Sequence, residues 1–443
     1  MDAIPQLANE KLSCSIFAAL STPMSQMPAA VIIVNFDFPP NQGIGGRRWA
    51  KLAKGLASMG LQVVVVKADP VSNNNISAWT QDTKSERIEV HSIKRTYPES
   101  VSHPKKGWKH KFRYLWDLNQ LKKEEQGTIY DVAIGWQEVL TQKLQELVVS
   151  KGIKHVIATG APFNALYYCA LFKQKNPEIK LLVDYRDPWL TAKNYGMPFL
   201  DSNAMNVEIE KQNIVFRFAD KIISPYQELT DRLFSEAKSV TNDRSKFHVL
   251  PHFYDETDLH IPRESIIKTK EKVTFVYGGA LYTGTSDILK EWKTCLQDIE
   301  SNSTELSKQL YFKLFTDNQI EAKIFEGLST IQISPTIGKG IFDELVGADF
   351  CIMMAADHNK NQFTTKFFEY LPLRKPFVYL GPEGELSKFI ESNRLGRRLE
   401  NISRDLPILV NDFNAGRLNF NSDFDISSYT LHHATDRLLS FLS

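Results

Sequence analysis

The chain has 443 residues, of which 42% are hydrophobic and 24% are charged, and its formal net charge is +1. Such a composition is typical of a globular protein with two or three domains and excludes a disordered or fibrous chain. Because the chain carries no global basic field, we expect no nucleic-acid partner. The four cysteines lie far apart, which indicates reduced thiols and neither a disulfide framework nor a metal site.

The N-terminal segment, residues 1–29, is expected to be a loosely ordered extension. Its apolar stretch, SCSIFAAL, is short and has no basic flank, so it makes a poor signal peptide. No apolar run approaches the roughly 20 residues that are needed to span a bilayer. We therefore expect a cytoplasmic protein, either free or peripheral on the inner face of the membrane.

The chain is organised around residues 31–69. A short apolar strand at residues 31–34 runs into a Pro/Gly loop, which a helical apolar repeat and a second apolar strand follow. This pattern predicts a parallel βαβ unit with Gly45 and Gly46 where the helix begins. Free backbone N–H groups at such a helix start favour a bound phosphate. The alternative is that the glycines only allow a tight turn, since their spacing is not the dinucleotide pattern G-x-G-x-x-G.

Residues 71–85 are predicted to be a loop, and residues 103–125 mix cations with aromatic rings. The sequence of this second segment is HPKKGWKHKFRYLWDLNQLKKEE. An interfacial membrane helix needs such a composition, with apolar rings at the acyl boundary and cations on anionic headgroups. The alternative is a solvated helix with one face packed on its domain.

From residue 130 onwards, short apolar segments alternate with helical ones. YDVAIGW, HVIATG and LLVDYRDPW are predicted strands, each ending in a polar or glycine-containing loop. Strands that alternate with helices predict a parallel doubly wound sheet, in which ligands bind beyond the carboxyl ends of the strands. The loops at residues 160–164 and 186–189 are therefore candidate site segments.

The predicted domain order follows from a second copy of the opening pattern. Residues 30–253 are expected to form a first Rossmann-like domain, and the polar residues 254–272 a linker. VTFVYGGALYTGT then repeats the strand and glycine turn, and further strands predict a second Rossmann-like domain over residues 273–425. Residues 426–443 predict a final helix that could return to the first domain. The sequence thus predicts two α/β domains facing a central cleft.

Several of these segments together resemble one known family. PPNQGIGGRRWAKLAKGLASMG, YRDPW, YGGALYTG and TTKFFEYLPLRKPFVYLGP follow one another as in GT-B glycosyltransferases. The most similar group is the family 4-like enzymes of bacterial cell-surface polysaccharide assembly. The resemblance covers residues 31–396 and rests on the order and spacing of the motifs, since none of them is decisive alone.

The resemblance implies a division of labour between the domains. The first domain would bind a glycan acceptor or its lipid-linked precursor, and the second a nucleotide diphosphate sugar as donor. No cofactor and no metal ion are expected, because protein cations and helix N-termini stabilise the departing diphosphate in this fold. The implied donor-binding residues are Gly45, Gly46, Gly279, Tyr282, Thr283, Thr364, Thr365, Lys366 and Glu369.

Within this set, the segment TTKFFE has the clearest chemistry. Thr364 and Thr365 are expected at a helix start, where hydroxyls can cap and free N–H groups can face phosphate. Lys366 adds a point charge. Glu369 matches the family glutamate that binds the ribose hydroxyls. Without the resemblance, Thr364 would be a simple N-cap, with Lys366 and Glu369 on a solvated surface.

The chain departs from the family pattern at three places. Asn361 replaces a second glutamate eight positions before Glu369, and residues 283–286 offer hydroxyls where relatives have a cation. His252 and Phe253 replace an asparagine-glycine turn. These departures leave open the donor sugar and the strength of diphosphate binding, and with them a non-catalytic homologue.

For the reaction, the resemblance implies transfer with retention, in which the leaving phosphate oxygen takes the acceptor proton. If a protein base acts instead, Asp187 is the candidate, because it lies at a strand end facing the predicted cleft. Arg186 would orient Asp187 or contact a phosphate; alternatively, the two residues only brace their loop. Arg47 and Arg48 are candidates for binding an anionic acceptor, and one of the two is expected to be solvated. A sugar-nucleotide epimerase of the same fold is the second hypothesis.

Overall fold

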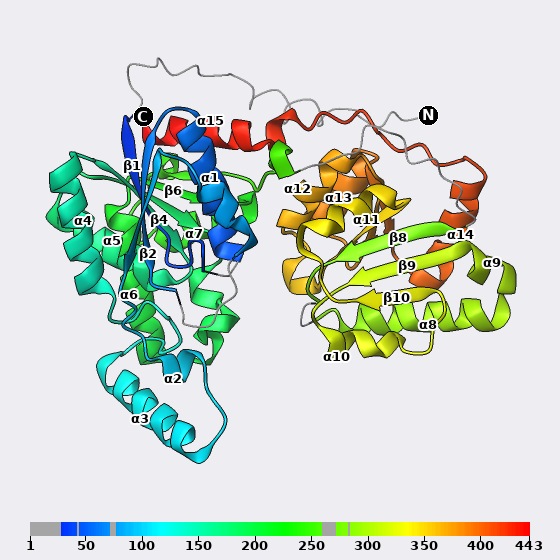
Figure 1. Cartoon of the computed structure of the whole chain (residues 1–443), viewed down its shortest axis with the longest axis horizontal. Helices are drawn as coiled ribbons and strands as arrows, with labels where there is room; N and C mark the ends of the chain where they lie inside the picture. The colour runs from blue at the N-terminus through cyan, green and yellow to red at the C-terminus, as the bar shows by residue number, and fades with distance from the viewer. Residues whose placement is uncertain (1–27, 42–43, 71–76, 259–271, 282–283) are drawn as a thin grey trace, which may run out of the picture.

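The computed structural model describes residues 28–41, 44–70, 77–258, 272–281 and 284–443. Two α/β domains lie side by side, and each is built on one parallel sheet that helices cover (Figure 1). The predicted fold class, two Rossmann-like doubly wound domains, is confirmed. None of the described helices combines the length and the hydropathy of a membrane-spanning segment.

The first domain contains a seven-stranded sheet in the order β3-β2-β1-β4-β5-β6-β7. The chain starts in the middle, builds outwards to β3 and then returns to the other side of β1, which creates a switch point between β1 and β4. Ligands of doubly wound sheets bind beyond the carboxyl ends of the strands at such a point. The strands are β1 Ala30–Val34, β2 Gln62–Ala68, β3 Ile88–Ile93, β4 His155–Gly160, β5 Lys180–Tyr185, β6 Lys221–Ser224 and β7 Phe247–Val249. The helices are α1 Ile44–Ser58, α2 Glu99–Ser102, α3 Trp108–Glu124, α4 Gln137–Lys151, α5 Phe163–Lys175, α6 Ser202–Phe218 and α7 Gln227–Ala237.

The second domain repeats this topology with a six-stranded sheet in the order β10-β9-β8-β11-β12-β13. Its switch point lies between β8 and β11. The strands are β8 Val273–Gly278, β9 Leu310–Phe315, β10 Ile331–Ser334, β11 Phe350–Met354, β12 Phe377–Leu380 and β13 Gly396–Leu399. The helices are α8 Ser286–Asn302, α9 Thr304–Gln309, α10 Gln319–Ala322, α11 Ile341–Gly347, α12 Thr365–Tyr370, α13 Glu385–Ser392 and α14 Ile402–Asn414.

Strand β1 shows why the central strands are continuous apolar runs. Val31 and Ile33 belong to the core beneath α1, whereas Ile32 and Val34 belong to the core beneath α4 and α5. Successive side chains of a strand point to opposite faces of its sheet. Because helices cover both faces, every position of the strand must be apolar.

The C-terminal helix α15, Leu431–Leu442, lies on the first domain although it follows the second in sequence (Figure 1). Its apolar side chains join those of α1 in one core. A Cβ atom at Gly55 of α1 would lie 2.2 Å from Thr435 Oγ1, so the two helices approach closely. The Leu431 N–H donates to the Tyr254 carbonyl at 2.8 Å. The chain therefore connects the two domains twice.

Residues 130–136, predicted as a strand, form turns instead. The Asp131 carboxylate accepts hydrogen bonds from the backbone N–H groups of Ala133, Phe163 and Asn164 at 2.7–3.0 Å. Burial raises the pKa of Asp131 to about 6. The Asp131 carboxylate therefore holds this segment in a turn and accepts hydrogen bonds from the first N–H groups of α5, the helix that follows β4.

The strand beside β2 is β3, Ile-Glu-Val-His-Ser-Ile, which forms one edge of the sheet. Its four inner residues are partly buried or exposed, so the strand has no continuous apolar run. The predicted loop at residues 71–85 is also corrected in part, since Ala78–Thr83 form a 3₁₀ helix, η2. The remainder of that segment, residues 71–76, lies outside the described residues.

Candidate functional site

The two domains meet where α1 approaches α12. Arg47 of α1 and Glu369 of α12 form an ion pair, and their side chains are only 8% and 17% exposed. Beside this pair, Gln362 Nε2 donates to Tyr226 Oη at 3.1 Å. The contact therefore joins one predicted acceptor-binding residue to one predicted donor-binding residue.

The glycines at the start of α1 allow two close approaches. A Cβ atom at Gly45 would lie 1.8 Å from Arg186 Nη1, and one at Gly46 would lie 2.2 Å from the Asp37 carbonyl oxygen. Because no side chain fits at such distances, glycine lets Arg186 and the loop after β1 pack on the first turn of the helix. The structure thus brings together the glycine loop and the loop after β5, which sequence reasoning had treated separately.

The loop after β5 has a buried anchor and an accessible carboxylate. Trp189 is fully buried, its Nε1 donates to Glu208 Oε2 at 2.8 Å, and its ring stacks on Phe163 with centroids 5.1 Å apart. Arg186 Nε donates to Asp187 Oδ2 at 3.1 Å, and the Asp187 side chain is 50% exposed. Trp189 therefore fixes the loop while Arg186 orients Asp187.

Both arginines of α1 are buried, so the expectation that one is solvated is wrong. Arg48 Nη2 donates to the Leu250 carbonyl at 2.7 Å, and Nη1 donates to the Pro251 carbonyl at 3.1 Å. Arg48 Nε lies 3.4 Å from Asp184 Oδ2. These contacts tie the segment after β7 to the middle of the sheet and give Arg48 a structural role.

Arg47 has a different environment, although it is the neighbouring residue. Its guanidinium lies 4.4 Å from the centroid of the Trp79 ring, and within the described structure Nε has no hydrogen-bond partner. Burial lowers the pKa of Arg47, while the carboxylates of Asp258 and Asp82 oppose this shift. Arg47 is therefore a cation with an unused donor at the boundary between the domains.

In the second domain, Lys366 lies against the glycine turn that follows β8. Its Nζ donates to Tyr277 Oη at 3.1 Å and lies 4.6 Å from the centroid of that ring. Gly279 has a φ of +134°, and a Cβ atom there would lie 2.2 Å from Lys366 Nζ. Burial lowers the pKa of Lys366 to about 8. A neighbouring anion would favour its charged form.

Thr364 lies at the start of α12, two residues before Lys366. Thr364 is at the N-cap position of α12 but makes no side-chain cap hydrogen bond, and its buried Oγ1 has no partner among the described residues. Because α12 has only six residues, the charge of the site comes from side chains more than from a helix dipole. The predicted donor residues Tyr282 and Thr283 lie outside the described residues.

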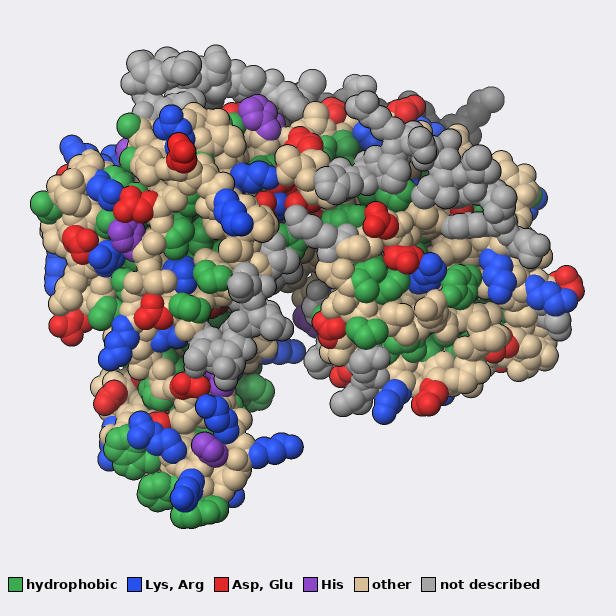
Figure 2. Space-filling view, in the orientation of Figure 1, with side chains coloured by type: hydrophobic (Ala, Val, Ile, Leu, Met, Phe, Trp, Pro, Cys, Tyr) green, Lys and Arg blue, Asp and Glu red, His purple; other side chains and the backbone are tan. Residues whose placement is uncertain are grey.

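A small pocket lies between the domains at this contact. It encloses about 20 Å³, which is space for about one water molecule. The pocket has no room for a ligand of more than a few atoms, while Figure 2 shows a notch between the lower parts of the two domains. The pocket is lined by Arg47, Arg48, Lys51, His252, Phe253, Asp255 and Thr365.

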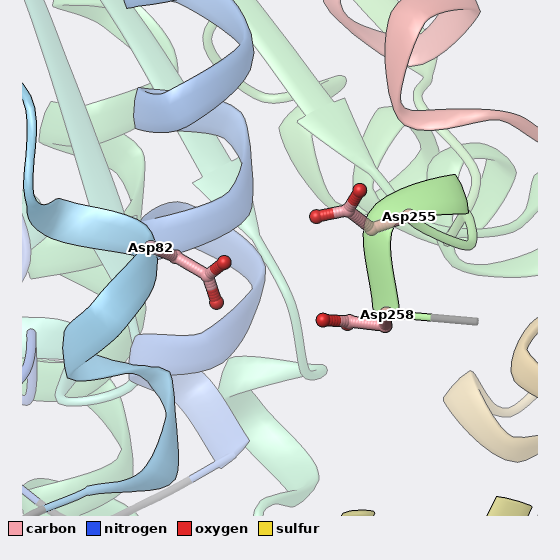
Figure 3. Close-up of side chains that lie close together, drawn as sticks. All are labelled: Asp82, Asp255 and Asp258. Carbon is pink, nitrogen blue, oxygen red and sulfur yellow. The ribbon is translucent and has the colours of Figure 1, made fainter. Parts of the chain in front are cut away.

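Three carboxylates converge beside α1 (Figure 3): Asp82 lies on η2, Asp258 ends the 3₁₀ helix η7, Glu256–Asp258, and Asp255 directly precedes η7. Lys51 Nζ lies 2.9 Å from Asp82, 2.8 Å from Asp255 and 2.7 Å from Asp258. The ammonium thus takes the place that a metal ion would need. Burial alone would raise the pKa of Asp255, but hydrogen bonds from Lys51 and Lys54 hold that pKa well below its usual value. Through Lys51, residues 255–258, which follow the last strand of the first domain, are held against α1.

Sequence reasoning missed Lys51, Asp184 and the environment of His252. Asp184 is fully buried within β5 and accepts a hydrogen bond from Trp49 Nε1 at 2.8 Å; a carboxylate inside the apolar run LLVDY was the available signal. Burial, with nearby Arg48 and Arg47, lowers the pKa of His252 well below its usual value. No local pattern distinguishes Lys51 from a solvated lysine.

The backbone matches solved GT-B structures over nearly the whole chain. A structure from E. coli described as trehalose-6-phosphate bound with UDP-2-fluoro glucose has a TM-score of 0.57 and 9% identity, covering 93% of this chain and 95% of that chain. A glycotransferase of kitacinnamycin has a TM-score of 0.54 and 10% identity, with 94% and 100% covered. The UDP-GlcNAc 2-epimerase of Neisseria meningitidis bound to UDP-GlcNAc has a TM-score of 0.51 and 9% identity, with 93% and 99% covered.

These likenesses show that the fold is GT-B. No protein-family model and no curated protein matches the sequence. At identities this low, the activity has to be argued from the residues of the site.

Proposed function

We propose that the protein is a glycosyltransferase that takes a sugar from a nucleotide diphosphate donor. The observation that carries the proposal is the position of Glu369, which faces Arg47 of the other domain and lies one helical turn beyond Lys366. These side chains offer a carboxylate for ribose hydroxyls and cations for a diphosphate. Structures of the same fold described as bound to UDP-2-fluoro glucose and UDP-GlcNAc support a nucleotide sugar as the ligand.

In the proposed donor complex, Glu369 accepts hydrogen bonds from the ribose hydroxyls once Arg47 has moved away. Arg47 and Lys366 then compensate the charge of the diphosphate. Thr364 Oγ1, which is buried without a partner among the described residues, adds a hydroxyl on the same side. Because these cations stabilise the leaving group, the proposal requires no metal ion.

The proposed acceptor is a cell-surface glycan or its lipid-linked precursor, held by the first domain. Its hydroxyl oxygen bonds to the anomeric carbon of the sugar while the bond from that carbon to the phosphate oxygen breaks. The hydroxyl proton passes to the leaving phosphate oxygen, and configuration is retained. The half-exposed carboxylate of Asp187 is the alternative proton acceptor, with Arg186 to orient it.

A sugar-nucleotide epimerase is the second candidate, because a UDP-GlcNAc 2-epimerase structure has the same fold. A non-catalytic binding protein is the third, since Asn361 stands where the resembling family has a glutamate. The Asn361 side chain accepts a hydrogen bond from the Glu385 N–H at 3.2 Å.

Product analysis with a panel of nucleotide diphosphate sugars separates these candidates. For a transferase, adding a glycan or lipid-linked acceptor raises the rate of nucleotide release and yields a glycosylated acceptor. Conversion of one sugar nucleotide into its epimer without an acceptor would favour the epimerase. Ligand binding stabilises the native state. If no nucleoside diphosphate raises the melting temperature, the result therefore favours the non-catalytic protein over the transferase and the epimerase.

A further inference from the structure

The surface helix α3 carries an apolar stripe that faces solvent. Positions 108, 112, 115 and 116 fall on one face of a helix with 3.6 residues per turn. The opposite side of α3 packs on the protein and contains the buried residues Asp117 and Leu121. The four side chains of the stripe are Trp108, Phe112, Leu115 and Trp116, which are 77%, 71%, 48% and 49% exposed.

Lysines border this stripe on both sides. The helical period places Lys109 and Lys111 on either side of the line from Trp108 to Phe112, and Lys122 and Lys123 repeat this arrangement at the C-terminal end. All four lysines are exposed.

Little negative charge offsets these lysines. Of the two acidic residues of α3, Asp117 is buried and accepts a charged hydrogen bond from Arg113 at 2.7 Å; Glu124 is exposed at the end of the helix. The surface is therefore an apolar stripe between two cationic borders.

The helices α2 and α3 form an arm that projects from the first domain (Figure 1), and hydrophobic side chains gather at its outer end (Figure 2). The arm follows β3 in sequence. Since all strands of the sheet are parallel, it leaves from the same edge of the sheet as the loops that carry Gly45 and Arg186. The stripe and the candidate site thus belong to one side of the domain.

We propose that α3 is an interfacial helix that docks the protein on a bilayer rich in anionic lipid. Trp108, Phe112 and Trp116 would enter the boundary between headgroups and acyl chains, and the bordering lysines would contact anionic headgroups. The lysines favour a lipid surface over a protein partner, because protein interfaces are depleted in lysine and lipid headgroups attract it. This inference stands apart from the proposed sugar transfer, although docking would bring the first domain to the surface where a lipid-linked acceptor resides.

Sedimentation of the full chain with vesicles tests the proposal. The protein is expected to bind vesicles of phosphatidylcholine mixed with phosphatidylglycerol and to bind phosphatidylcholine alone much more weakly. The double variant Trp108→Ser/Trp116→Ser should lose at least about tenfold in affinity, because the apolar rings no longer leave water. Lys109→Gln/Lys111→Gln should lose roughly thirtyfold at low salt, at about fivefold for each cation.

Matched controls use exposed residues of other helices. Val149→Ser near the C-terminus of α4 removes an apolar side chain that is 73% exposed, and Lys290→Gln/Lys308→Gln removes two lysines that are 67% and 66% exposed. These variants should bind vesicles as the wild type does. Thermal melting by circular dichroism establishes that all variants are folded.

Two outcomes overturn the proposal. The first is an absence of binding to anionic vesicles, or equal binding by the wild type and both α3 variants. The second is a dimer, seen by sedimentation velocity without lipid, that Trp108→Ser/Trp116→Ser abolishes; it would assign the stripe to a second copy of the chain. Vesicle binding is measured without a sugar nucleotide, so a failure to bind vesicles does not contradict the proposed sugar transfer. In the same way, an absence of sugar transfer does not contradict the binding of α3 to a bilayer.

Discussion

Arg47 and Glu369 form a largely buried ion pair that joins the two domains. Glu369 is the carboxylate proposed to bind the donor ribose, and Arg47 is a cation proposed to face the diphosphate. In the present arrangement each side chain compensates the charge of the other. Donor binding would replace this pair by contacts from Glu369 to ribose and from Arg47 to phosphate, so that both groups keep partners when the domains separate.

A double-mutant cycle with Arg47→Met and Glu369→Gln measures this pair. We expect a coupling free energy of about 1–3 kcal/mol in urea unfolding, because the two groups are in contact and poorly solvated. The exposed pair Lys290 and Asp287, whose side chains are 67% and 95% exposed, is the control and should give less than about 1 kcal/mol. Additive effects of the Arg47 and Glu369 variants would contradict the expectation.

Glu369→Ala should weaken the binding of nucleoside diphosphates by roughly tenfold or more, the loss of one or two charged hydrogen bonds. Isothermal calorimetry measures the affinity. The control is Glu383→Ala, since the Glu383 side chain is 61% exposed and forms an ion pair with Lys388 on the protein surface. Unchanged affinity in a folded Glu369→Ala protein would remove Glu369 from the donor site.

The pH dependence of nucleotide binding should report on Lys366. Burial lowers its pKa to about 8, and a bound diphosphate would raise that pKa because it favours the ammonium form. Below this pKa, Lys366 is charged in the free protein and in the nucleotide complex, so it adds no pH dependence to the affinity. Above it the free protein must take up a proton, so affinity falls by up to about tenfold per pH unit. Lys366→Met should abolish this fall, and equal slopes in both proteins would contradict the assignment.

The two glycines of α1 should differ in their tolerance of alanine. Gly46→Ala should cost about 1–3 kcal/mol of unfolding free energy, because the Asp37 backbone cannot move aside. Gly45→Ala should cost less, since the Arg186 side chain can swing away. Gly347→Ala in α11, where a Cβ atom meets nothing within 4 Å, should be neutral or stabilising by up to about 1 kcal/mol. Equal losses in all three would contradict this account.

Lys51→Met should destabilise the protein by up to about 3–5 kcal/mol at neutral pH, since it removes the cation that three clustered carboxylates share, although Lys54 stays beside Asp82 and Asp255. In the wild type the pKa of Asp255 is held low. The ionised carboxylate therefore stabilises the folded state at pH values above its pKa in the unfolded chain, and this stabilisation is lost as the pH falls towards the pKa of the folded state. In the variant, protonation relieves repulsion between the carboxylates, so the difference in unfolding free energy between the two proteins should shrink as the pH falls below about 4. A chelator should leave the wild-type melting temperature unchanged; a chelator-dependent decrease would contradict the assignment of Lys51 as the resident cation.

Local patterns predicted most strands because burial on both faces leaves an unbroken apolar run. Strands β1, β2 and β8 are such runs, and their positions agree with the sequence. The segment YDVAIGW has a similar composition, yet Asp131 accepts three backbone hydrogen bonds there and turns the chain. A side-chain contact to the distant Phe163 decided that conformation, and no local pattern reveals such a contact.

Local sequence patterns were enough to predict the two doubly wound domains, since the same strand, glycine turn and helix recur in both halves. They also predicted a basic aromatic helix within residues 103–125, which the structure has at Trp108–Glu124. Which charges meet depends on the tertiary structure. A lysine or arginine has the same appearance in a sequence whether it is solvated or buried, because burial and ion pairing depend on distances between segments far apart in the chain. Only the fold therefore distinguishes Arg48, held by backbone carbonyls, from Arg47, which faces Glu369.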